Sequence, residues 1–244
     1  MVGALAGLAA LLFGQGVVRL RRRGRADLAG RDRAALFALG LAVTVVALVG
    51  PVDRLADTNL WVHMLQHVLI GDAAAALLVV AVRGPLLVFL LPAPVLVRVA
   101  RARSFLGLLL RPRVAFALWA TNLAVWHVPY LYDLALRHQG LHDTEHLCWV
   151  VAGLLVWTLL VDPGSHRRLT VGGRVALAAA MFAAGQVLAD VLVFSFHQIY
   201  PAYPGRTEQQ LAGVVMMAEQ LLTLGTLAFV LLRPRLRSAR LVAA

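Results

Sequence analysis

Long apolar runs separated by clusters of arginine restrict the fold of this chain more than any other feature. Seven runs approach or exceed the roughly 20 residues that a helix needs to cross a bilayer. They are Val2–Leu20, Ala34–Pro51, Asn59–Val82, Pro112–Tyr130, His142–Val161, Val171–Phe196 and Glu208–Leu232. Hydrophobic residues make up 61% of the chain, and a soluble domain has only about 45–50%. The sequence therefore predicts an all-α, polytopic membrane helical bundle of about seven transmembrane helices.

The length of the chain leaves room for one transmembrane domain, residues 1–244, and for no second one. A further apolar stretch, 84–103, is short and is broken by Pro92 and Pro94. It lies between groups of arginines that a crossing would place on opposite sides of the membrane. We therefore predict that 84–103 is a short re-entrant or interfacial segment.

The distribution of arginine predicts the orientation, because cytoplasmic loops of membrane proteins carry an excess of basic residues. All 23 basic residues are arginine, and all but Arg54, Arg137 and Arg206 fall in alternate loops or the C-terminal tail. We predict an N-terminus outside and a C-terminus in the cytoplasm. The net charge of +11 thus indicates topology, and we predict no nucleic-acid binding, since no basic and aromatic surface module is present.

Aromatic residues gather at the predicted outer ends of the runs. Such residues often form a belt at the membrane–water interface, which would explain them here. They are Tyr130, Tyr132, Tyr200, Tyr203, Trp61, Trp126 and Trp149.

Histidines concentrate on the predicted outer side, and only His166 falls in a cytoplasmic loop. The outer ones are His63, His67, His127, His138, His142, His146 and His197. The pairs His63/His67 and His142/His146 have i, i+4 spacing, which puts both rings on one helix face, about 6 Å apart along the axis. Neutral imidazole binds copper, zinc or haem iron. We predict a metal site near the outer surface, in which His63, His67 and His146 share one ion and His127, His142 and His197 are further candidates.

Other side chains within the runs could support such a site. Met216 and Met217 could add thioether ligands suited to Cu(I), although methionine in an apolar helix more often serves packing. Acidic residues could orient histidines, relay protons, bind a cation or bond neighbouring helices. They are Asp72, Asp190, Glu208 and Glu219. We expect Asp190 and Glu219 to face the bundle interior, and Asp190 to reach a polar partner on a neighbouring span.

Motifs of soluble enzymes are missing from the sequence. It has no Walker loop, no GxSxG and no HExxH, whose residues carry phosphate binding, nucleophilic attack and zinc-dependent hydrolysis. We therefore predict a protein that is not an enzyme.

Four short motifs follow one another from Asn59 to about Glu219. They are His63-Met-Leu-Gln-His67, Trp126-His-Val-Pro129 with Tyr132-Asp133, Glu145-His146 with Gly153 and Trp157, and Glu208-Gln-Gln-Leu-Ala-Gly213. In this order, on seven apolar runs, they resemble the CtaG family of cytochrome c oxidase assembly factors, the kind linked to caa3-type oxidases. The resemblance implies a seven-helix protein of the bacterial plasma membrane that helps to mature a haem–copper oxidase. It also implies oxidase subunits as partners, copper as the metal handled, and a shared core that includes His63, His67, His127 and His146.

Other functions remain open at this point. A haem-binding electron-transfer protein would also need histidines, but on opposite sides of a long apolar slot, whereas copper needs several ligands in one small pocket. A copper transporter would need polar residues along the whole path. A structural assembly chaperone would need no metal, and a homo-oligomer is compatible with any of these functions.

Overall fold

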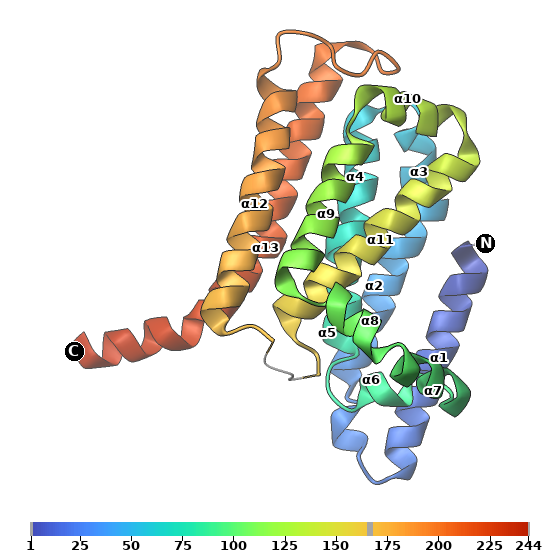
Figure 1. Ribbon diagram of the computed structural model, residues 1–244, viewed down its shortest axis with the longest axis vertical. Helices are drawn as coiled ribbons and strands as arrows, with labels where there is room; N and C mark the ends of the chain where they lie inside the picture. The colour runs from blue at the N-terminus through green and yellow to red at the C-terminus, as the bar shows by residue number, and fades with distance from the viewer. Residues whose placement is uncertain (1, 165–167, 244) are drawn as a thin grey trace.

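The computed structural model describes the backbone of residues 2–164 and 168–243, and side chains as far as Pro234. His166, which the sequence places in a cytoplasmic loop, lies outside these residues. Every regular element in the described part is a helix, and no strand occurs there (Figure 1). The prediction of an all-α bundle is confirmed.

Each of the seven apolar runs contains a long helix or a set of consecutive helices. Their bounds are α1 (Val2–Arg22), α2 (Arg31–Val49), α4 (Leu60–Val68) continued by the π-helix η2 (Leu69–Ala73) and α5 (Ala74–Ala81), α9 (Pro112–Trp126), α11 (Gln139–Val161), α12 (Val171–Phe194) and α13 (Gly205–Ala243). Six spans in the described residues are long and apolar enough to cross a membrane. The seventh, α9, reaches that length only together with α8 (Arg103–Leu109), from which it is bent by 65°.

Short helices lie at the two ends of the bundle (Figure 1). At one end are α3 (Pro51–Ala56), α10 (Pro129–Arg137) and the loop that joins α12 to α13. At the other end are η1 (Ala26–Leu28), α6 (Leu86–Phe89), α7 (Ala93–Arg101) and α8. The arginine-rich segments gather at this second end, as the alternation of loops requires. Which end faces the cytoplasm stays a prediction.

The segment 84–103 forms α6, a break and α7, at the arginine-rich end. The guanidinium group of Arg19, near the end of α1, donates to the carbonyl oxygens of Phe89 and Leu91 at 3.2 and 3.0 Å. Since Phe89 ends the short helix α6 and Leu91 follows it, their carbonyls have no partner within the helix. These bonds hold the segment against α1, and its entry into the membrane stays a prediction.

A close approach of two backbones sets the position of α11 against the third span. A Cβ atom on Gly153 would overlap the carbonyl group of Gly71, and one on Gly71 would touch the Trp149 side chain. Small residues permit this kind of contact between membrane helices. Gly71 lies in η2, a single π-helical turn of the type often found at functional sites. The contact lets α4 and the first half of α11 place side chains against each other.

Candidate metal centre

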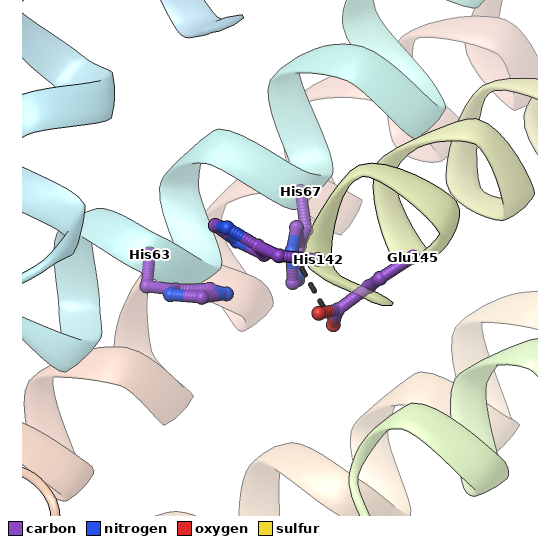
Figure 2. A group of neighbouring side chains, drawn as sticks. All are labelled: His63, His67, His142 and Glu145. Atoms are coloured by element: carbon purple, nitrogen blue, oxygen red, sulfur yellow. Dashed lines mark ion pairs between the residues drawn. The ribbon is translucent and has the colours of Figure 1, made fainter. Parts of the chain in front are cut away.

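Three histidines and one glutamate converge between α4 and α11. Their ligand atoms all lie within 4.8 Å of one another, and Figure 2 shows the four side chains pointing toward a common space. The residues are His63 and His67 on α4, and His142 and Glu145 on α11. Spacings of four and three residues put each pair on the helix face that meets its neighbour. All four are buried, and His63 and Glu145 are only 1% exposed.

The distances within this group suit a single ion. The ring centroid of His63 lies 4.5 Å from that of His67 and 5.2 Å from that of His142. Nε2 of His67 lies 3.5 Å from Oε1 of Glu145. Metal bonds to imidazole and carboxylate are about 2 Å long, so ligand atoms around one ion stand about 3–4 Å apart. Only small side-chain movements would bring the group into coordination.

Most of the polar atoms that face this space have no hydrogen-bond partner among the described residues. Such buried atoms are Nε2 of His63 and His142, both ring nitrogens of His67, and both carboxylate oxygens of Glu145. Buried polar atoms nearly always find a partner, and a cluster of exceptions calls for a missing ligand. The donor set, three imidazoles and a carboxylate, is one that first-row transition metals prefer. The residues present therefore fit a metal ion.

Tyr203, in the loop between α12 and α13, orients His63. Its hydroxyl group donates to the carbonyl oxygen of Ala56 at 3.0 Å and lies 3.0 Å from Nδ1 of His63. Burial raises the pKa of Tyr203, because a phenolate would lose its hydration. Since the single hydroxyl proton goes to Ala56, Nδ1 of His63 must donate to the tyrosine oxygen. The lone pair of His63 is then on Nε2, which faces the cluster, as in metal sites whose histidines are held by a second hydrogen bond.

Two further predicted histidines lie beside the group without joining it. The ring centroid of His146 lies 4.2 Å from that of His142, with the two planes tilted by 49°, and 5.5 Å from that of His67. Nδ1 of His127, at the end of α9, donates to the Leu123 carbonyl at 2.7 Å, and its Nε2 faces Met64. We predicted that His63, His67 and His146 share an ion; in the structure His142 and Glu145 stand where we placed His146.

The remaining predicted residues lie at different places. His138 and His197 are exposed. Met216 is buried and lines a small pocket together with His67 and Glu219. Met217 is half-buried and packs against the apolar core. Asp72 accepts a hydrogen bond from the Trp157 indole at 3.1 Å. The remaining acid, Glu208, has a buried Oε2 without a hydrogen-bond partner at the start of α13, away from the four converging ligands.

The expectation that Asp190 has a polar partner on a neighbouring span is wrong. Its hydrogen bond, at 2.8 Å, comes from Gln186 on α12 itself. The two residues are four apart, so one helical turn is enough to satisfy the carboxylate locally.

Two other expectations need correction. The paired histidines, which we placed close to the surface, are buried in the bundle and are each at most 9% exposed. The tyrosines do not form an interfacial belt: Tyr132, Tyr200 and Tyr203 are buried, and only Tyr130 of the four is exposed. The hydroxyl of Tyr200 donates to the His127 carbonyl at 3.0 Å, and that of Tyr132 to Tyr203 at 3.3 Å. Internal carbonyl and hydroxyl oxygens accept from these groups, so water is not needed.

Glu145 is the ligand candidate that our reasoning from residue spacing missed. The sequence does contain a signal for it: Glu145 lies three residues after His142, on the same face of one helix turn. We counted it only as part of a family motif, because carboxylates were sought deep in the spans rather than beside the histidines.

A sequence model for the cytochrome c oxidase caa3 assembly factors matches residues 11–238. The chain belongs to this family. Neither the curated proteins nor the solved structures contain a match to the chain. This caa3 assembly factor is thus a multi-pass membrane protein of a family that acts in the assembly of cytochrome c oxidase. The resemblance found in the sequence is confirmed over nearly the whole chain.

Proposed function

We propose that this assembly factor binds copper, as cargo, through His63, His67, His142 and Glu145, and passes it to a subunit of the oxidase in the bacterial plasma membrane. The observation that carries the proposal is the set of buried ligand atoms that lie within 4.8 Å of one another and mostly lack a hydrogen-bond partner. A haem–copper oxidase needs copper to mature, and the family membership connects this site to that process.

The chemistry of the ligands supports copper over the alternatives. Among divalent first-row ions, copper binds a given set of nitrogen and oxygen ligands most tightly. Glu145 supplies one negative charge, which partly compensates a cation in a buried place. Haem would need a long apolar slot between its axial histidines, and the close packing of four ligand atoms favours a single ion. The chemistry of the site thus ranks the copper function first and the haem protein second.

A cavity of about 310 Å³ between α1, α2 and α11 supports a route for the cargo. Most of its wall is apolar, but its polar lining residues include Asp53, Asp143 and His146. Because the ring of His146 contacts that of His142, we propose that this cavity lets copper or the oxidase subunit approach the site. A transporter would need a polar path to the other end as well, and the apolar lining makes that reading weaker.

Copper titration of purified variants tests the proposal. Alanine at His63 or His67 would leave cavities in a buried contact, so glutamine is the better replacement. We expect His67→Gln and His142→Gln to lose copper binding and to unfold at temperatures close to that of the unmodified protein. In cells, oxidase subunits should lack copper while their haem content changes less. His197→Gln, at an exposed histidine outside the site, is the matched control.

The outcomes separate the candidate functions. Unchanged copper affinity in both variants would remove these histidines from the site. Unchanged affinity with lost oxidase activity would instead favour the structural chaperone. A visible spectrum and metal analysis of the purified protein would distinguish haem, copper and neither.

A further inference from the structure

Met64 and His127 make a contact that ordinary hydrogen bonding does not explain. Nε2 of His127 lies 3.4 Å from Sδ of Met64, and both side chains are buried. Nδ1 of the same ring lies 2.7 Å from the carbonyl oxygen of Leu123, which can only accept. In the neutral ring the proton is therefore on Nδ1, and Nε2 has a free lone pair. Two atoms with lone pairs then face each other with no proton between them.

A small pocket extends from this contact into the bundle. Its volume is about 20 Å³, roughly enough for one water-sized occupant. His67 and Met216 also line the pocket. Two imidazoles and two thioethers thus border the same small space, which continues from His67 toward Asp72 along the third span. Thioether sulfur is a soft ligand that selects Cu(I) over divalent ions.

Negative charge is available where a buried cation would need it. Asp72 and Glu219 line the same pocket, and neither has an ion pair with a basic residue among those described. The carboxylate oxygens of Glu219 and Oε1 of Gln220 are buried without a hydrogen-bond partner, and the Gln220 side chain is 93% buried in the same lining. A cation in an apolar interior is stable only beside opposite charge and polar ligands.

We infer that Met64, His127 and Met216 form a second metal site, selective for Cu(I), with Asp72 and Glu219 as its counter-charges. The inference rests on the proposed copper function and extends it: the histidine–glutamate centre takes divalent metal, and the deeper site takes the monovalent ion. His67 borders both sites and separates them. No electron transfer between the sites is part of the proposal, since copper reaches the deeper site already as Cu(I).

The test measures silver(I) and Cu(I) binding to the purified full-length protein, under anaerobic conditions and against a chelator of known affinity. Silver(I) is the probe of choice because it has the same charge and softness but no accessible second oxidation state. X-ray absorption should show sulfur in the first shell of either ion. Met64→Leu and Met216→Leu preserve volume closely, so both variants should fold, and each should weaken Cu(I) affinity at least tenfold and reduce the sulfur signal. Met217→Leu, one residue farther and half-buried, should change neither.

The two proposals fail in different ways. His142→Gln should abolish divalent metal binding and leave the sulfur-rich Cu(I) site. Met64→Leu should weaken Cu(I) binding and leave divalent metal binding unchanged. Divalent binding that disappears in His142→Gln, together with a Cu(I) spectrum without sulfur in the unmodified protein, would overturn the second site alone. Sulfur-coordinated Cu(I) without any divalent binding would overturn the histidine–glutamate centre alone. Equal losses in Met217→Leu and Met64→Leu would also overturn the second site.

Discussion

The hydroxyl group of Tyr203 lies 3.0 Å from Nδ1 of His63, although the two residues are 140 positions apart. Tyr203 belongs to the loop between α12 and α13, whereas His63 stands in the first turn of α4. The α12–α13 hairpin, which packs on α4 through α13, therefore contacts the candidate metal centre and holds one ring nitrogen of a candidate ligand. Removing that hydroxyl would test the connection.

Tyr203→Phe should weaken copper binding by roughly 10- to 100-fold, the usual effect of losing a hydrogen bond that orients a ligating histidine. The phenyl ring keeps the packing, so thermal stability should fall far less than in a variant that opens a cavity. Tyr130→Phe is the control, because Tyr130 is exposed and 77% accessible. Equal copper affinities of the two variants would show that the Tyr203 hydroxyl does not orient His63.

Glu145→Gln should reduce affinity for divalent copper more than tenfold, because an uncharged amide leaves a buried cation with less compensating charge. The substitution keeps the shape of the side chain, and the protein should remain folded. Isothermal titration with Cu(II) and Zn(II) measures the loss. Asp143→Asn, at an exposed acid on the same helix turn, should leave both affinities unchanged. A similar loss in Asp143→Asn would mean that Glu145 acts through its long-range negative charge and not as a ligand.

Gly153→Ala should separate α11 from η2, because a Cβ atom has no room beside the Gly71 carbonyl. Overpacking of this kind costs roughly 1–3 kcal/mol. His142 and Glu145 should then move away from His63 and His67, so copper affinity and the unfolding temperature should fall together. Gly225→Ala in α13, where a Cβ atom meets nothing within 4 Å, should keep both. Normal copper affinity in Gly153→Ala would show that this contact does not position the site.

The orientation can be tested with single cysteines. In a Cys148→Ser background, Arg137→Cys at the metal-site end should react with a membrane-impermeant maleimide in intact cells. Arg25→Cys at the arginine-rich end should react only after permeabilisation. The prediction follows from the unequal distribution of arginine between the two ends, and the reverse labelling pattern would invert the topology.

Apolar runs are a local property of the sequence, and for that reason they were enough to predict the helices, while four short motifs predicted the family. The runs predicted at Val2–Leu20 and Val171–Phe196 correspond to α1 and α12 within a few residues, since crossing a bilayer depends on composition over about 20 positions. The break near Pro92 was likewise visible in the sequence, because proline is tolerated in the first turn of a helix but interrupts a helix interior. The π-helical turn at Leu69–Ala73 had no comparable signal.

Helical spacing predicted that the two histidine pairs share helix faces, and the structure agrees for both, with ring centroids 4.5 Å apart in His63/His67 and 4.2 Å apart in His142/His146. It could not determine which residues of α11 complete the group. That choice depends on the rotation and depth of α11, which the contact between Gly71 and Gly153 sets, and it selected His142 and Glu145 over His146. The same limit applies to Tyr203: its hydrogen bond to His63 exists only because distant segments pack together, and periodicity within one helix carries no information about such contacts.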